Sequence, residues 1–252
     1  MKNKVLKIKV WLKIIFRLLL NPQKLFLSMD DFKFLSDEEV ILFLKDNRVG
    51  LVRFGSGENG YLAGYPRPHQ KHEKGLEKKI KDILLNYKKD LNENNYIVTV
   101  PLDIILGDKL EKRNYQQKVW RGAPKFAILP FLKKGHLYGS PFCFRLSNVI
   151  CNDKEKYISL IKSLFEGRNI IYVGPEEKFA SMFTPVKFIK IPPKDLFENF
   201  NELKKQIKEE AKKYEDPLVL ITAGVAATAM SAELNDEEVL TYDVGSLLRW
   251  DK

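Results

Sequence analysis

Apolar and polar positions along the chain form blocks that predict strands and helices in turn. Short apolar runs typical of buried strands occupy residues 49–54, 96–100, 137–144, 169–173, 186–191, 218–222 and 239–243. Helical spacing is found at residues 36–46, 76–87, 109–120, 154–165, 196–214 and 225–234. Strands that alternate with helices favour a mostly parallel sheet covered on both faces, so the predicted fold class is α/β and Rossmann-like.

The first block of the chain predicts a helix of a different kind. Residues 5–20 are apolar except for cations, and at about 100° per residue Lys9, Lys13 and Arg17 fall on one stripe opposite a broad apolar face. We predict that residues 1–28 form a basic amphipathic helix that associates with a membrane surface, ahead of a domain at residues 29–252. The alternative is a helix packed on the domain or on a second copy of the chain.

Other membrane roles for this segment are disfavoured by its sequence. Cations interrupt it every few positions, whereas a spanning helix needs about 20 predominantly apolar residues. The residues that follow, 21–24, do not resemble a signal-peptide cleavage site. The segment is therefore expected to lie on a membrane rather than to cross it.

The charge of the protein is concentrated in the same segment. The net charge is +10, from 43 basic and 33 acidic residues, and residues 1–24 hold seven of the basic residues and no acidic one. The remaining 36 basic and 33 acidic residues nearly balance, which argues against nucleic acid as a partner. The predicted partner of residues 1–24 is an anionic membrane surface.

Two cysteines, Cys143 and Cys151, are too few for a disulfide framework and lack metal-binding spacing. A reducing compartment is the default for such a chain. Together with the basic helix, this predicts a cytoplasmic protein held at the inner face of the plasma membrane.

Three segments that follow predicted strands are candidates for chemistry, because ligands of parallel sheets bind at the carboxyl ends of the strands. The first is the glycine-rich segment 53–60, where Gly55 and Gly57 allow close approach of a ligand and Glu58 offers a carboxylate to a divalent cation. It is not a P-loop, because it lacks the Gly-Lys-Ser/Thr ending. It is also not a dinucleotide-binding GxGxxG motif, because Glu58 would place a carboxylate where the pyrophosphate lies. A plain turn between a strand and a helix is the alternative.

The other two segments lie near the end of the chain. Gly224 precedes a small-residue helix whose start is open to an anion, although tight packing explains the same residues equally well. Asp243 ends the last predicted strand and could bind a metal or a sugar hydroxyl, or it could cap a short helix.

In order and spacing, these segments resemble the GT-D fold glycosyltransferases, bacterial enzymes that use nucleotide-sugar donors. The family's Arg-Phe-Gly-Asp-Gly-Glu segment corresponds to residues 53–58 of this chain, and the resemblance covers roughly residues 35–250. Further matches are Gly64, Gln70, Val100-Pro101-Leu102-Asp103, Trp120, Tyr138-Gly139-Ser140, Arg145, Ile191-Pro192, Gly224 and Asp243-Val244-Gly245. The resemblance implies the GT-D type of α/β fold and a sugar transferase.

The chain departs from the family pattern at three presumed functional positions. Ser56 replaces the Asp of the family's metal- and diphosphate-binding Asp-x-Glu, Leu146 replaces a Pro, and Ser246 replaces a His. The resemblance thus leaves Glu58 as the metal ligand, for Mn²⁺ or Mg²⁺, with affinity weakened by the loss of one carboxylate.

The resemblance implies transfer of a sugar from a nucleotide-diphosphate donor, expected to be a UDP-sugar, to a glycan or lipid-linked glycan in cell-surface polysaccharide or glycoprotein assembly. Asp243 is the expected general base, with Asp103 second and Glu58 as a further catalytic residue. The donor diphosphate is expected to contact Arg53, Gly55, Ser56, Gly57, Arg145 and Gly224.

Two other functions stay open at this point. One is a noncatalytic relative that supports a partner transferase, with a second copy of the chain as a further potential partner. The other is a different nucleotide- or phosphate-dependent enzyme on the same kind of sheet.

Overall fold

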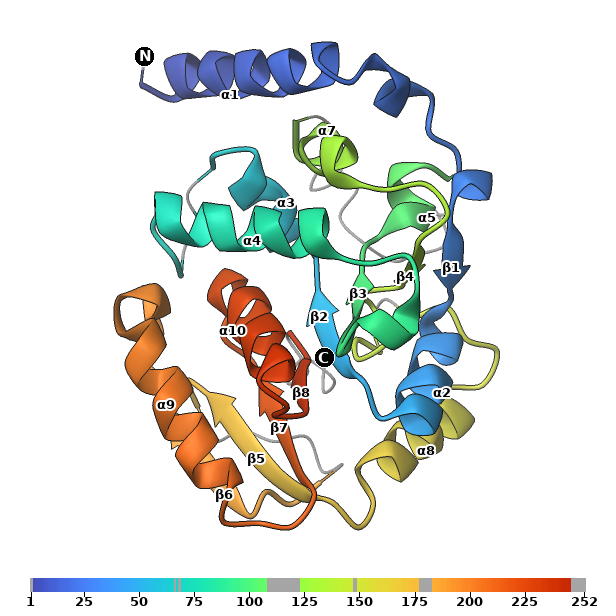
Figure 1. Ribbon diagram of the computed structural model, residues 1–252, viewed down its shortest axis with the longest axis vertical. Helices are drawn as coiled ribbons and strands as arrows, with labels where there is room; N and C mark the ends of the chain where they lie inside the picture. The colour runs from blue at the N-terminus through green and yellow to red at the C-terminus, as the bar shows by residue number, and fades with distance from the viewer. Residues whose placement is uncertain are drawn as a thin grey trace.

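A computed structural model describes residues 2–65, 67, 69–107, 123–146, 149–176 and 183–245 of the chain (Figure 1). The predicted helix at 109–120, Trp120 and Ser246 lie outside the described residues.

The centre of the fold is one eight-stranded sheet in the order β1-β4-β3-β2-β8-β7-β5-β6. Every pair of neighbouring strands among the described residues is parallel. The strands are β1 (Lys33–Leu35), β2 (Gly50–Arg53), β3 (Tyr96–Thr99), β4 (Leu137–Gly139), β5 (Asn169–Gly174), β6 (Lys187–Lys190), β7 (Pro217–Ile221) and β8 (Thr241–Asp243). The predicted parallel α/β architecture is confirmed.

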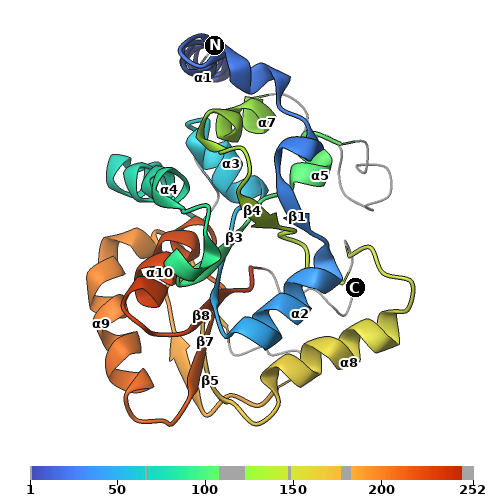
Figure 2. The same cartoon turned by 45° about the vertical axis from the view of Figure 1, so that its right-hand side comes forward.

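Helices cover both faces of this sheet (Figures 1 and 2). One face packs against α3 (Ser56–Leu62), α4 (Lys74–Asn86), α9 (Phe200–Ala211) and α10 (Val225–Asp236), and the other against α2 (Asp37–Asn47) and α8 (Lys154–Phe165). Because both faces are covered, β3 is buried along its length, as are most residues of β5 and β7, which is why these strands read as continuous apolar runs.

The remaining short elements connect the sheet to these layers. They are α5 (Leu102–Ile105), α7 (Ala123–Ile128) and the 3-10 helices η1 (Pro22–Phe26), η2 (Met29–Asp31), η3 (Leu91–Glu93), η4 (Leu129–Phe131) and η5 (Leu196–Asn199).

Helix α10 packs closely on β2 and β8, which lie side by side in the middle of the sheet. Its small residues permit this approach, and a Cβ atom added to Gly50 of β2 would lie 2.1 Å from the side chain of Asn235. Asn235 in turn accepts a hydrogen bond from the Thr241 N–H (2.9 Å) and donates one to the Thr241 carbonyl (2.9 Å). The end of α10 thereby positions the start of β8.

Most predicted elements agree with the structure to within a few residues. The Ser36 capping box begins α2, with the Glu39 N–H donating to the Ser36 hydroxyl (3.4 Å) and the Ser36 N–H to the Glu39 carboxylate (2.7 Å). The strand predicted at 137–144 is too long: β4 ends at Gly139, because Ser140 bonds to the Asp37 carboxylate and the chain turns at 141–144.

The first block of the sequence forms α1 (Lys2–Leu19), which packs on the domain beside α7. Val10, Ile14 and Leu18 are buried there as part of the core. None of the described helices is both long enough and apolar enough to cross a bilayer. The boundary between residues 1–28 and 29–252 as separate units stays a prediction.

Candidate active site at the carboxyl ends of β2 and β8

The segments that leave β2 and β8 bring together the side chains of three predicted site residues: Arg53, Glu58 and Asp243. Leu51 pairs with Tyr242 in the parallel register, so Arg53 and Asp243 lie at the same edge of the sheet. Here the strand order reverses, since β3 and β4 lie on one side of β2 while β8, β7 and β5 lie on the other. Ligands of open parallel sheets bind at this kind of position.

Arg53 is held with its guanidinium between two glycine backbones. Its Nε donates to the Pro141 carbonyl (2.8 Å), in the turn after β4. A Cβ atom on Gly55 would lie 2.9 Å from one terminal nitrogen, and a Cβ atom on Gly245 would lie 2.8 Å from the other. Gly245 also has a positive φ of 58°, which glycine adopts at little cost. Both glycines therefore make room for an oriented, half-buried cation.

Glu58 lies in the first turn of α3 and is buried. Its Oε2 accepts a hydrogen bond from the Gly55 N–H at 2.7 Å. This backbone amide, which the sequence offered as a phosphate ligand, is therefore bonded to a carboxylate of its own chain. The same bond fixes the turn between β2 and α3.

Asp243 is a buried carboxyl group whose pKa is raised to about 7. Burial is the main cause, the charge of Glu58 raises the pKa further, and Arg53 and hydrogen bonds from the Gly245 N–H (3.0 Å) and Thr228 oppose it. A carboxyl group with a pKa near neutrality can accept and return a proton under physiological conditions. This is the property that a general base needs, and the role of Asp243 as the general base stays a prediction.

Thr228 of α10 connects Asp243 to β2, a role that the sequence analysis did not assign. Its Oγ1 lies 3.3 Å from the Asp243 Oδ2 and 3.1 Å from the Arg53 carbonyl oxygen. A hydroxyl group has one proton to donate, so it can satisfy only one of these acceptors. When Asp243 is protonated, its proton can be donated to Thr228, which then donates to the Arg53 carbonyl.

Arg67 is a second residue that the sequence analysis missed. Its Nε donates to the Gly57 carbonyl (2.9 Å) and its Nη2 to the Ser56 carbonyl. It therefore stabilises the first turn of α3 from outside the motif. No short pattern marks Arg67 in the sequence, because it lies in a loop and acts through tertiary contacts.

The start of α10 lies against the start of α3 beside this cluster. A Cβ atom on Gly57 would contact the Val225 side chain at 3.5 Å, and Gly224, with φ +60°, has open space where its Cβ would be. A cavity of about 250 Å³ opens there at the carboxyl ends of β5, β6 and β7. It is lined by His69, Pro175, Glu176, Ile191, Pro192, Pro193, Leu196, Thr222, Ala223 and Gly224.

The other predicted residues lie around this centre. Ser56 is the first residue of α3. Asp103 is buried in α5, at the end of the strand next to β2. Arg145 lies in the segment that includes Pro141, where its N–H donates to the Phe142 carbonyl (2.7 Å).

The described residues contain no group of three or more His, Cys, Asp or Glu side chains that could hold a metal ion. At this edge of the sheet, Glu58 and Asp243 already accept hydrogen bonds from Gly55, Gly245 and Thr228. This donor set does not fit a metal ion held by these side chains alone. Cation binding by Glu58 stays a prediction.

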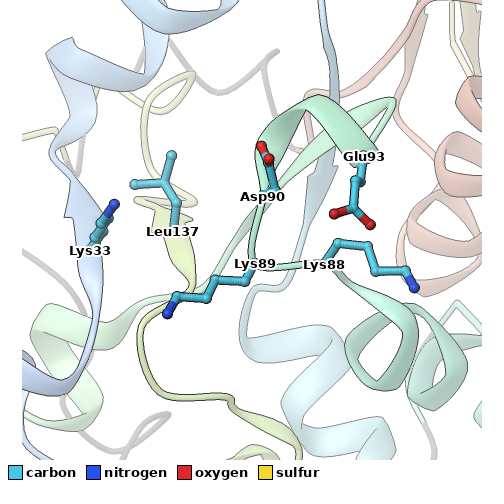
Figure 3. Close-up of a pocket in the computed structure, with 6 residues that line it drawn as sticks. All are labelled: Lys33, Lys88, Lys89, Asp90, Glu93 and Leu137. Carbon is cyan, nitrogen blue, oxygen red and sulfur yellow. The ribbon is translucent and has the colours of Figure 1, made fainter.

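A wider hollow of about 570 Å³ lies elsewhere in the molecule (Figure 3). It borders the amino ends of β1 and β4, where Lys33 and Leu137 begin these strands. Its other lining residues, Lys88, Lys89, Asp90 and Glu93, are exposed and of mixed charge. Neither Arg53 nor Asp243 is among the residues that line this hollow.

Comparison with known proteins identifies one curated relative, the probable glycosyl transferase Gly of Streptococcus gordonii. The two sequences are 21% identical over an alignment 226 residues long, and this alignment covers 84% of this chain and 32% of the relative. The chain therefore spans about a third of the length of this relative.

Solved structures share the fold. One is described as the highly conserved domain of unknown function 1792 with a distinct glycosyltransferase fold; it has a TM-score of 0.72 and 23% identity over 87% of this chain and 80% of that one. Another, described as a new glycosyltransferase from Streptococcus sanguinis, has a TM-score of 0.72 and 19% identity over 86% and 82% of the two chains.

The family model for the glycosyltransferase GT-D fold matches residues 51–249, which include the β2–α3 turn, α10 and β8. This match covers most of the chain and all of the cluster around Arg53 and Asp243. The chain therefore belongs to the glycosyltransferase GT-D fold family.

Proposed function

We propose that the protein transfers a sugar from a nucleotide-diphosphate donor, a UDP-sugar in the first instance, to a glycan or lipid-linked glycan acceptor of cell-surface polysaccharide or glycoprotein assembly. The observation that carries the proposal is the Arg53 guanidinium, held between Gly55 and Gly245 beside Glu58 and Asp243. A planar guanidinium suits the paired oxygens of a diphosphate.

Transfer breaks the bond between the anomeric carbon of the sugar and the diphosphate oxygen, and forms a bond from that carbon to the acceptor oxygen. Negative charge develops on the departing diphosphate. We assign the stabilisation of this charge to Arg53 and to the start of α10 at Gly224, since both are oriented before the reaction. The nucleoside diphosphate leaves with the electron pair of the broken bond.

The acceptor hydroxyl loses its proton as its oxygen bonds to the sugar. In this proposal the proton passes to the ionised form of Asp243, and Thr228 and Gly245 hold the carboxylate in place. Glu58 acts by positioning the turn that carries Gly55 and by raising the pKa of Asp243. The open cavity beside Gly224 offers room for the nucleoside part of the donor.

The test compares Arg53→Lys with the wild-type chain. Lysine keeps the charge but loses the planar fork, so we expect at least a tenfold loss in affinity for UDP-sugars and in turnover. Calorimetric titration measures binding, and release of UDP measures turnover, each with Mn²⁺, with Mg²⁺ and with EDTA.

Arg48→Lys is the matched control, because Arg48 is exposed and pairs with Asp216 away from the candidate site. Equal binding and turnover by the Arg53 variant would contradict the proposed site. If the wild-type chain bound no nucleotide sugar at all, the noncatalytic alternative would replace the proposal.

A further inference from the structure

Helix α1 has two apolar faces, of which the domain covers only one. Val10, Ile14 and Leu18 are buried in the core, spaced four residues apart on one side of the helix. The opposite side exposes large apolar side chains: Phe16 is 63% exposed and Leu19 is 72% exposed. The exposed set, which continues into η1, is Ile8, Leu12, Ile15, Phe16, Leu19, Leu20, Leu25 and Phe26.

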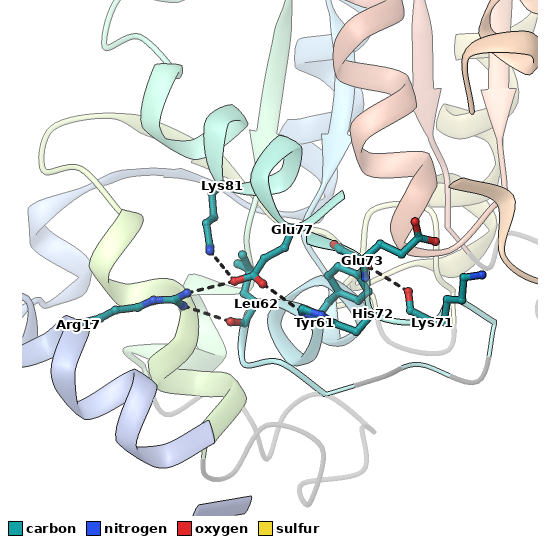
Figure 4. A network of polar contacts seen from close by, with 8 residues as sticks. All are labelled: Arg17, Tyr61, Leu62, Lys71, His72, Glu73, Glu77 and Lys81. Atoms are coloured by element: carbon teal, nitrogen blue, oxygen red, sulfur yellow. Dashed lines mark hydrogen bonds and ion pairs between the residues drawn. The ribbon is translucent and has the colours of Figure 1, made fainter. Parts of the chain in front are cut away.

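The orientation of α1 is set by polar contacts as well as by packing (Figure 4). Arg17 donates to the Glu77 carboxylate (3.2 Å) and to the Leu62 carbonyl (3.2 Å), and its guanidinium lies 5.5 Å from the Phe131 ring centroid. Glu77 is buried and also pairs with Lys81 and with His72. The contacts of Arg17 and Val10 thus fix which face of α1 is turned away from the domain.

The exposed apolar side chains of α1 and η1 form a cluster rather than a scatter of single residues. Single exposed leucines need no explanation, and the largest patch on a typical monomer is roughly 300–600 Å². Here eight large apolar side chains lie together on α1, η1 and the residues between them, each at least 46% exposed. A cluster of exposed apolar side chains of this kind marks an interaction surface.

We infer that this face of α1 and η1 binds the surface of an anionic lipid bilayer. Residues 1–24 contain seven cations and no acidic residue. Arg17 and Lys24 bond to the domain, through Glu77 and the Leu132 carbonyl, and the other five cations keep the segment that carries the apolar face strongly positive. A second copy of the chain would bring two such segments together, and repulsion between like charges opposes that contact. Anionic headgroups complement the cations, while the acyl boundary accepts the apolar side chains.

Lipid binding at this face would bring the candidate active site close to the bilayer. Leu62, whose carbonyl contacts Arg17, is the last residue of α3, and Ser56 and Glu58 are in its first turn. A helix of this length spans roughly 10 Å, and α1, which is about 10 Å across, lies between Leu62 and the proposed lipid face. A lipid-linked acceptor would then lie within reach of the site; this consequence rests on the proposed function, whereas lipid binding itself does not.

The experiment is flotation of the full-length chain with vesicles of phosphatidylglycerol and phosphatidylcholine, and with vesicles of phosphatidylcholine alone. We expect binding to the anionic vesicles, weakened by salt. Phe16→Ser with Leu19→Ser should reduce binding at least tenfold, because both side chains leave the apolar surface. Leu42→Ser with Leu85→Ser is the matched control, since these leucines are exposed on α2 and α4.

Circular dichroism and size-exclusion chromatography with light scattering accompany each variant, to show that it is folded and to give its oligomeric state. Absence of vesicle binding by the wild-type chain would overturn the inference. Unchanged vesicle binding by the folded Phe16 and Leu19 variant would also overturn it. A third contrary result is a wild-type chain that binds no vesicles and forms a dimer, which the Phe16 and Leu19 substitutions alone convert to a monomer. Vesicle binding needs no donor sugar, so a failure here is distinct from a failure of nucleotide-sugar binding.

Discussion

At the scale of single residues, the structure assigns different chemistry to carboxyl groups that the sequence presents alike. Glu58 accepts a backbone hydrogen bond within its own turn, whereas Asp243 is buried between β8 and α10 with Thr228 as its partner. Burial raises the pKa of Asp243 to about 7. The charge of Asp243 therefore changes near neutral pH.

This pKa has a measurable effect on stability. Between pH 3.8, the ordinary pKa, and about 7, the folded chain holds a proton on Asp243 that the unfolded chain has released. The contribution of Asp243 to the free energy of unfolding is therefore fully present below pH 3.8, and it decreases as the pH rises from 3.8 to about 7. At roughly 1.4 kcal/mol per unit of pH, the change is on the order of a few kcal/mol.

We expect Asp243→Asn to remove this dependence. The free energy of unfolding of the variant, relative to the wild-type chain, should rise by about 2–3 kcal/mol between pH 5 and pH 8. Urea unfolding at several pH values measures this difference, and turnover should be lost in the same variant. Parallel pH profiles for the two proteins would contradict the assignment.

At the scale of elements, the contact between α10 and the centre of the sheet decides where the site forms. Gly50 of β2 lies under Asn235 of α10, and Asn235 bonds to Thr241 at the start of β8. These three residues fix the distance between α10 and the strands β2 and β8, and the position of α10 along them. The start of the same helix, at Gly224 and Thr228, is thereby held at the carboxyl edge of the sheet.

We expect Gly50→Ala to destabilise the protein by about 2–4 kcal/mol, because the new methyl group would overlap the Asn235 side chain. Asn235→Ala should cost about 1–3 kcal/mol through its lost hydrogen bonds. The double variant should cost at least about 1 kcal/mol less than the sum, since alanine at 235 removes the overlap. Additive costs in a double-mutant cycle of denaturant unfolding would show that the contact is not tight.

At the scale of the molecule, α1 stabilises the domain as well as presenting a surface. In a chain that begins at residue 29, the part of the core on which Val10, Ile14 and Leu18 pack would be exposed to water. Glu77 would also lose its ion pair with Arg17. We expect it to be less stable than the full chain by about 3–6 kcal/mol. Denaturant midpoints of the two chains measure this. Equal midpoints would mean that α1 adds nothing to the stability of residues 29–252.

The sequence predicted the elements of this fold well where the signals are local. The Ser36 capping box begins α2, and helix α8 has the predicted bounds. Prediction failed where tertiary contacts override local preference. The segment after Gly139 turns because Asp37, far away in sequence, accepts hydrogen bonds from Ser140 and from the Ile150 N–H.

For the candidate site, the sequence by itself determined the residue types and their order: an arginine, glycines and a glutamate after one strand, and an aspartate after the last. These are local properties, because strands and turns depend on spacing and on glycine. The tertiary structure alone decided that Arg53 lies between Gly55 and Gly245, that Thr228 and Arg67 join the site, and that Arg17 turns inward to Glu77. Those contacts join residues distant in sequence, so they form only when the packing of α1, α3 and α10 is complete.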